Sequence, residues 1–357
     1  MAVRCLSLKN SSMTDMSEMV VVVGGGSAGM ETAGQLAKAG YRVTIIEKES
    51  GTGGHVNNWY HLFPDRRDSK EVVKYLEEQT ANSNITLLTN KTVRTVEKDH
   101  GMLRVMTNEG DEFNADAVVM ATGFDLFRSE RKEEYGYGIY DNVITSADLE
   151  IMFRKGELRR VNGEIPGKIG FVHCVGSRDE KVGNVYCSKL CCVTAVKQAM
   201  EVKKHIPDSK VFCFYMDMRM GGAHYEELYR ESQETYGVNY IRGKVSEVSE
   251  NINNKLVIKV EDTLAGRPLK MELDMLVLMA GMEMSQSGAA VAASSGIATG
   301  ENRFFAPADH HYGSNKSNID GIFYAGTCTA PMNITETISH ARAAAADVTD
   351  YLKKRSK

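Results

Sequence analysis

Four cysteines near the middle of the chain have the residue type and the spacing for redox or metal chemistry. Their pattern is C-x12-C-x3-C-C, and they are Cys174, Cys187, Cys191 and Cys192. The other three cysteines, which have no partner at a useful spacing, are Cys5, Cys213 and Cys328. An odd number of unevenly spaced cysteines argues against the disulfide framework of a secreted protein. We therefore expect a cytoplasmic protein, in which clustered thiols are more often metal ligands or redox groups.

Two kinds of metal centre compete for these thiols. A single zinc ion needs all four sulfur atoms at about 2.3 Å in a tetrahedron, and adjacent cysteines at a helix start reach one ion awkwardly. An iron–sulfur cubane presents separate iron corners and suits the spacing better. The alternative is that these cysteines are small core residues, with one redox disulfide among them.

A glycine-rich segment near the N-terminus has the composition of a phosphate-binding loop. Residues 24–29 read GGGSAG, which satisfies G-x-G-x-x-G between a β-branched run, Met19–Val23, and a helix-forming stretch that ends at Gly40. In this motif the first glycine forms a tight turn, the second lets the backbone approach a pyrophosphate, and the third allows close helix–strand packing. Glu47 ends the next predicted strand, near the spacing expected for a carboxylate that binds ribose hydroxyls. The segment therefore predicts a dinucleotide site.

The remaining elements predict an α/β protein with two Rossmann-like dinucleotide-binding-type domains. A second strand–helix pattern begins with the apolar run 169–176 and continues with a helix over about 190–205. It carries cysteines where a phosphate-binding glycine loop would stand. We assign residues 19–150 and 274–357 to a discontinuous first domain and residues 168–273 to an inserted second domain.

Composition and charge exclude several classes of protein. The net charge is −4, and no stretch dense in lysine and arginine indicates a nucleic-acid partner. The apolar runs fall far short of the roughly 20 residues of a helix that spans a bilayer. Residues 1–18 lack the apolar core of a secretory signal, and we expect a loose tail or arm there.

Several segments resemble known flavoproteins. Two short ones resemble the FAD-binding parts of the two-dinucleotide-domain flavoproteins, which share the architecture of thioredoxin and glutathione reductases; they are Ala121-Thr122-Gly123 and Gly326-Thr327. Three longer ones resemble the A-type subunit of the heterodisulfide reductases; they are TGGHVNNWYHLFP (52–64), CVGSRDEKVGNVYCSKLCCVTAVKQA (174–199) and AGTCTAPMNITETISHARAAA (325–345). Without the repeated C-x2-C ferredoxin motifs of the longer methanogen subunits, the chain is similar to the short form in sulfur-oxidising heterodisulfide-reductase-like complexes.

The resemblance implies two cofactors. It implies FAD in the first domain and a [4Fe–4S] cluster held by Cys174, Cys187, Cys191 and Cys192. The residues expected around FAD are Gly24, Gly26, Ser27, Ala28, Gly29, Glu47, Lys48, Gly53, Gly54, His55, Val93, Ala121, Thr122, Gly123, Gly326, Thr327, Asn333, Ile334 and Thr335. Lys197, in the helix after Cys192, is expected near the flavin ring, unless it is an exposed helix lysine. No catalytic side chain is assigned.

The implied function is electron transfer within a larger complex that takes part in cytoplasmic sulfur oxidation. A flavin that exchanges two electrons, beside a cluster that exchanges one, would convert paired electrons to single ones. The implied partners are B- and C-type subunits, a small lipoate-binding protein and a second copy of the chain in a homodimer. Two alternatives stay open: a self-contained NAD(P)H-dependent flavin disulfide reductase that uses Cys187 and Cys191, and a non-catalytic scaffold that holds structural zinc.

Overall fold

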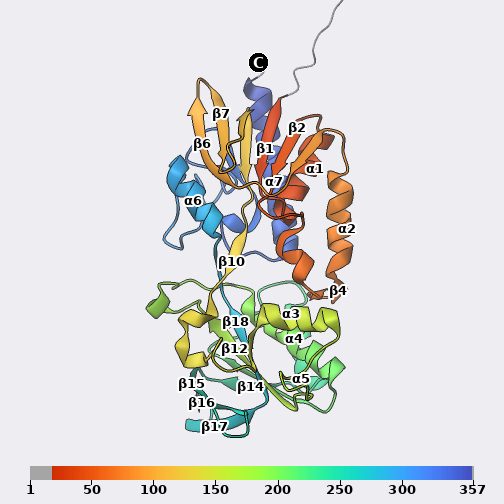
Figure 1. Ribbon diagram of the computed structural model, residues 1–357, viewed down its shortest axis with the longest axis vertical. Coiled ribbons are helices and arrows are strands. Elements are labelled where there is room, and N and C mark those ends of the chain that lie inside the picture. Colours follow the sequence, from red (N-terminus) through yellow and green to blue (C-terminus); the bar gives the residue numbers. More distant parts are fainter. Residues whose placement is uncertain (1–17, 356–357) are drawn as a thin grey trace, which may run out of the picture.

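Two parallel sheets organise the molecule, one in each of two lobes (Figure 1). The computed structural model describes residues 18–355, and in this part of the chain each of the two sheets has five strands. All pairs within these two sheets are parallel. The expected α/β class with two Rossmann-like units is therefore confirmed.

The first sheet is buried on both faces. In sheet order its strands are Ile322–Tyr324 (β20), Ala117–Met120 (β9), Met19–Val23 (β1), Arg42–Ile46 (β2) and Ile85–Leu88 (β5). Val20 and Val22 of β1 pack with helical residues on one face, whereas Val21 and Val23 pack on the opposite face. Successive side chains of a strand point to opposite faces. A central strand covered on both sides is therefore apolar at every position, as the valine run indicates.

Helices cover one face of this sheet, and a small antiparallel sheet covers the other. The helices are Ser27–Lys38 (α1), Ser69–Thr80 (α2), which packs against α1, and Ile334–Arg355 (α7). The opposite face carries Val93–Asp99 (β6), Met102–Thr107 (β7), Glu112–Ala115 (β8) and Gln286–Ser295 (α6).

The second lobe repeats this plan. In sheet order its strands are Val143–Thr145 (β11), Met275–Ala280 (β18), Lys168–Val175 (β12), Lys210–Tyr215 (β13) and Asn239–Arg242 (β14). The helices are Ser146–Lys155 (α3), Cys191–His205 (α4) and Tyr225–Glu234 (α5). The other face carries the antiparallel strands Val245–Glu250 (β15), Leu256–Asp262 (β16) and Arg267–Leu273 (β17). In β18, Val277 packs on the helical side and Leu276 on the other.

Two short antiparallel strands connect the lobes. Phe124–Leu126 (β10) pairs with Met282–Met284 (β19), and Figure 1 shows β10 between the two lobes. A hairpin of the first lobe, formed by His61–Leu62 (β3) and Arg67–Asp68 (β4), reaches the second lobe. At its tip, Arg66 Nη1 donates a hydrogen bond to the Tyr236 hydroxyl at 3.1 Å.

The strand pairing corrects the expected domain boundaries. Both β11 and β18, expected in the first domain, pair with each other in the second sheet, where Val143 lies opposite Leu276. The six residues of β18 are all buried because they lie between β11 and β12 and are covered on both faces. A buried apolar strand fits either sheet, so the sequence pattern of β18 alone does not say which sheet it joins.

The sequence predicts a loose N-terminal tail over residues 1–18 and no helix that spans a bilayer. The predicted tail lies outside the described residues, apart from Glu18, and so does Cys5. No helix within residues 18–355 combines the length and apolarity needed to cross a bilayer.

Candidate functional site

A cavity of about 680 Å³ lies between the two lobes and is lined by both. The first lobe contributes the loops that follow β1, β2 and β9 and the start of α7, and the second lobe contributes residues of α3 and α4. In open α/β sheets, ligands bind outside the carboxyl ends of the strands. The cavity lies at these ends in the first sheet and is therefore the candidate site.

The glycine loop after β1 excludes side chains at two of its positions. Gly24 has φ +110°, and a Cβ atom there would lie 2.3 Å from the carbonyl oxygen of Ala121. A Cβ atom at Gly29 would lie 1.9 Å from the carbonyl oxygen of Gly24. At Gly26, by contrast, a Cβ atom would meet no atom within 4 Å. Gly24 and Gly29 therefore shape the turn. Gly26 leaves open space beside the N-terminus of α1, where an anionic phosphate would be favoured.

A second glycine segment, Gly53-Gly54, packs against the glycine loop after β1. The backbone N–H of Gly53 donates to the carbonyl oxygen of Gly25 at 2.8 Å, and residues 26 and 53 form an isolated parallel bridge. A Cβ atom at Gly54 would lie 3.2 Å from the Cα atom of Gly26. The two segments therefore form adjacent parts of one cavity wall.

Glu47 holds the glycine loop in place. One carboxylate oxygen, Oε2, accepts from the backbone N–H of Gly25 at 2.6 Å, and Oε1 accepts from that of Glu49 at 2.8 Å. The side chain lies in the cavity wall and is largely buried. Glu47 thus stabilises the glycine loop, a role that differs from the binding of ribose hydroxyls expected from the sequence.

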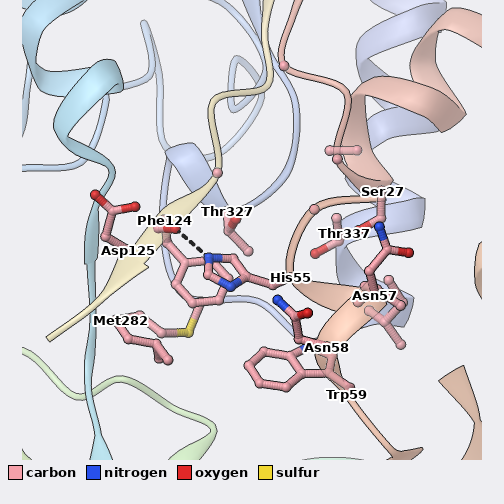
Figure 2. Close-up of a pocket in the computed structure, with 18 of the residues that line it drawn as sticks. Ser27, His55, Asn57, Asn58, Trp59, Phe124, Asp125, Met282, Thr327 and Thr337 are labelled. Atoms are coloured by element: carbon pink, nitrogen blue, oxygen red, sulfur yellow. Dashed lines mark hydrogen bonds between the residues drawn. The ribbon is translucent and has the colours of Figure 1, made fainter. Parts of the chain in front are cut away.

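Aromatic rings follow the second glycine segment into the cavity. Figure 2 shows His55 near the ring of Phe124, with Trp59, the only tryptophan of the chain, close by. The centroid of the His55 ring lies 4.3 Å from that of Phe124 and 5.9 Å from that of Trp59. The Nε2 atom of His55 lies 2.8 Å from the carbonyl oxygen of Phe124. A carbonyl oxygen only accepts, so Nε2 carries the hydrogen of this bond.

Most of the residues expected around FAD line the cavity. They are Gly24, Gly26, Ser27, Ala28, Glu47, Lys48, Gly54, His55, Val93, Ala121, Thr122, Gly123, Thr327, Asn333 and Ile334. Four others lie behind the wall or away from it, and these are Gly29, Gly53, Gly326 and Thr335. Gly326 packs against α1, since a Cβ atom there would lie 2.6 Å from the Cβ atom of Ala28. Thr335 is exposed. Four residues that were not expected from the sequence also line the cavity, and these are Asn57, Asn58, Met282 and Thr337 (Figure 2).

Three of the four clustered cysteines meet at the junction of β12 and α4. Near the end of β12, Cys174 has φ +59°, which is uncommon for a residue other than glycine. Its Sγ atom lies 3.9 Å from that of Cys191, the first residue of α4. The Cys192 thiol is directed at the carbonyl oxygen of Asp217, 3.5 Å away. All three are buried free thiols, and Cys191 also lines the cavity.

These thiols influence one another's ionisation. The contact of Cys192 with Cys191, and to a smaller extent with His173, lowers the pKa of Cys192 to about 4. Contacts with Cys174 and Cys192 raise the pKa of Cys191 well above its usual range. Neighbouring thiols whose pKa values move in opposite directions do not titrate independently. The junction therefore favours thiolate at some positions, and thiolate is the metal-binding form of cysteine.

The fourth cysteine, Cys187, lies in the loop between β12 and α4 and is partly exposed. Within residues 18–355, no group of three or more histidine, cysteine, aspartate or glutamate side chains has the arrangement of a site for one metal ion. A cubane binds its cysteines at separate corners and does not require such convergence. Both ring nitrogens of His173 and the Nη1 atom of Arg178 are buried beside these cysteines, and they have no hydrogen-bond partner in the described part of the chain. Buried polar atoms are normally paired, so the donor set and its unpaired neighbours fit a sulfur-rich cluster.

Lys197 is buried, which corrects the interpretation of an exposed helix lysine. It forms an ion pair with Glu150 of α3, and both side chains are nearly inaccessible and line the cavity. Glu150 also accepts from Gln198 Nε2 at 2.6 Å and from the backbone N–H of Tyr60 at 2.8 Å. A buried ion pair depends on such additional bonds. Sequence reasoning missed Glu150. The capping sequence at 145–148 marks a helix start but does not say which face of the helix meets the cavity.

The fold and the cavity have the two-domain architecture that is found in the disulfide reductases. Residues 3–139 match the family model described as pyridine nucleotide-disulphide oxidoreductase. The structure is similar to the thioredoxin reductases of T. acidophilum and Lactococcus lactis, each with a TM-score of 0.66 and with 19% and 18% identity. These matches cover 94% and 95% of this chain and 98% and 100% of the two reductases. Identities this low establish the fold alone.

Relatives of higher identity define the particular family. The chain is 40% identical to the A-type subunit of the H(2)/formate:CoB-CoM heterodisulfide,ferredoxin reductase of Methanococcus maripaludis, over 65% of this chain and 36% of that protein. It is 31% identical to the A-type subunit of the ferredoxin/F(420)H(2)-dependent CoB-CoM heterodisulfide reductase of Methanosarcina acetivorans, over 98% of this chain and 54% of that protein. The chain belongs to the family of heterodisulfide reductase A-type subunits, and this confirms the resemblance. It spans about one third to one half of the length of these relatives.

Proposed function

We propose that the chain is an FAD- and [4Fe–4S]-containing electron-transfer subunit of a heterodisulfide-reductase-like complex. One observation carries the proposal, because a single cavity is lined by the glycine loop at Gly24 and Gly26 and by Cys191 of the cysteine junction. A cofactor held by the glycine loop and one held by the cysteines would therefore be neighbours. Membership of the family of heterodisulfide reductase A-type subunits supports this pairing.

The first lobe would hold the dinucleotide mainly through its backbone. The N–H groups at the start of α1 favour the pyrophosphate, and the open space at Gly26 allows its close approach. Toward the second lobe, His55 and the Lys197–Glu150 pair would face the flavin ring. When bound, FAD exchanges electrons in pairs and the cluster exchanges them singly, so the chain would join two-electron to one-electron chemistry.

The second lobe would hold the cluster through Cys174, Cys187, Cys191 and Cys192. Three of these thiols are buried at the β12–α4 junction, and Cys187 is the most accessible. Cys191, in the cavity wall, would be the ligand nearest the flavin side. The surrounding apolar core limits the access of water to the site, which tunes the potential of a cluster.

We place this protein in cytoplasmic sulfur oxidation, together with B- and C-type subunits, a small lipoate-binding protein and a second copy of the chain. The support is the resemblance of its segments to the heterodisulfide reductase A-type subunits and the names of the relatives, which are subunits of reductases. In this setting the partner subunits would carry out the sulfur or disulfide chemistry.

Anoxic purification followed by quantitation of iron, acid-labile sulfide and flavin tests the proposal. We expect about four iron and four sulfide per chain, as a cubane requires, together with one flavin. The Cys191→Ala variant should lose iron and sulfide and retain flavin, because the change removes a thiol and leaves the glycine loop unaltered. Cys213→Ala is the matched control, since Cys213 is a buried free thiol in the same lobe core, and it should retain both cofactors. Unchanged iron in Cys191→Ala, or zinc without sulfide in the unaltered protein, would contradict the proposal.

A second candidate function is a self-contained NAD(P)H-dependent flavin disulfide reductase. The 3.9 Å contact between the sulfur atoms of Cys174 and Cys191 favours it, although the sequence indicates Cys187 and Cys191 as the redox pair. This function requires a second nucleotide site, but cysteines stand where the second lobe would carry a glycine loop. Rapid bleaching of the flavin by NADH or NADPH would support this candidate over the first.

A further inference from the structure

Arg178, four residues beyond Cys174, contains a buried donor without an acceptor. Its Nη2 atom donates to Oδ2 of Asp217 at 2.7 Å, but its Nη1 atom is buried and has no hydrogen-bond partner among residues 18–355. The backbone at Arg178 has φ +52°, which is uncommon for a residue other than glycine. An unpaired buried donor of a charged group is costly. An acceptor is therefore expected beside Nη1.

The groups beside the guanidinium are the cysteines. The pKa of Arg178 is raised first by its hydrogen bond to Asp217, and further by Cys174 and Cys187. Asp217 also offers its carbonyl oxygen to the thiol of Cys192. The Arg178–Asp217 pair is thus close to three of the four clustered cysteines.

We propose that Arg178 is a positioning residue of the cysteine site, with Nη1 donating to a sulfur atom there and its charge stabilising the reduced site. The proposal rests on the proposed function, because it assumes that the cysteines hold a cluster. Each electron that enters a thiolate-held cluster adds one negative charge. A guanidinium is always protonated and binds anionic groups in a fixed geometry, so it favours the more negative form. Hydrogen bonds to the sulfur atoms act in the same direction, and Asp217 keeps the guanidinium in place.

The test compares two arginines that share one carboxylate. Arg242 lies 3.9 Å from Oδ1 of Asp217 and is half exposed, so Arg242→Gln removes the same charge from a solvated position. The midpoint potential of the cluster is measured by an EPR-monitored titration of the anoxic, cofactor-loaded protein. We expect Arg178→Gln to change the oxidised-to-reduced ratio at a given potential about tenfold, which lowers the midpoint by about 59 mV for one electron. Arg178→Lys keeps the charge and should shift the midpoint less, and Arg242→Gln should stay close to the unaltered protein.

Each outcome has a defined meaning. An unchanged midpoint in Arg178→Gln, or an equal shift in Arg242→Gln, overturns the proposal. Where Arg178→Gln retains flavin but loses iron, Arg178→Lys decides: recovered iron supports a cation at this position, and iron lost in both variants overturns it. Absence of iron and sulfide from the unaltered protein contradicts the proposed function itself, and is therefore distinguished from failure of the role of Arg178.

Discussion

The two lobes share a strand–loop–helix junction but differ in the chemistry of the loop. In the first lobe, β1 leads through three glycines directly into α1, and the loop presents backbone N–H groups. In the second lobe, β12 leads through a longer loop into α4, and the junction presents the thiols of Cys174, Cys191 and Cys192. A helix N-terminus without side chains in front of it binds anions. The same place filled with thiols binds soft metals.

This difference shows that the sheet determines where a ligand lies and the loop determines which ligand it is. Both junctions lie at the carboxyl ends of parallel strands, and residues of both line one cavity. Fold alone does not define function, because sites are built on folds by their loops. Three tests follow, each of which alters one side of this comparison.

The largest effect is expected at the glycine loop, from Gly29→Ala. The new Cβ atom would lie 1.9 Å from the backbone oxygen of Gly24, which cannot move without opening the turn. We expect the free energy of unfolding to fall by more than about 3 kcal/mol, the upper part of the range for overpacking, together with loss of flavin. Urea denaturation and flavin quantitation measure the two effects.

Gly26→Ala is the matched control, because its Cβ atom would meet no atom within 4 Å. Without cofactor this variant should be as stable as the unaltered protein, yet it should bind FAD more weakly, since the methyl group occupies the space of the pyrophosphate. Quenching of Trp59 fluorescence on addition of FAD reports the affinity. Equal FAD affinity in Gly26→Ala and the unaltered protein would show that this loop does not hold the dinucleotide.

The sequence predicted what depends on local pattern and missed what depends on tertiary contact. The strand at Met19–Val23 and the helix starting near 190 lie close to their predicted bounds, because apolar runs and helix-forming stretches are local signals. The strand β11 has only three residues, too few to show a period. The partner of Lys197 could not be predicted because Glu150 lies 47 positions away on a different helix. The pairing of residues 26 and 53 likewise arises only when two loops meet.

An intermediate effect is expected where the second lobe contributes to the cavity wall, from Lys197→Met. This change leaves the carboxylate of Glu150 buried without its cation, although Gln198 and Tyr60 still donate to it. Removing one partner of a buried pair costs about 3 kcal/mol. The double variant Lys197→Met/Glu150→Gln should recover most of this loss, because no buried charge remains. A double variant less stable than Lys197→Met would contradict the assignment of the ion pair, and thermal unfolding at several urea concentrations provides the comparison.

The smallest effect is expected at the contact between the lobes, from Arg66→Ala. Arg66 pairs with Glu231 of α5 at 3.4 Å and donates to Tyr236, so it joins the β3–β4 hairpin to the second lobe. The pair is partly exposed, and such pairs contribute at most about 1 kcal/mol. Arg67→Ala is the control, because Arg67 contacts only first-lobe acids, Asp65 and Glu71, in its ion pairs. Both variants should lose little stability, but only Arg66→Ala should separate the unfolding transition seen by Trp59 fluorescence from that seen by circular dichroism. If the two transitions stay coincident in Arg66→Ala, the hairpin does not help to hold the lobes together. The cavity wall and the paired strands β10 and β19 would then be sufficient to keep the lobes in place.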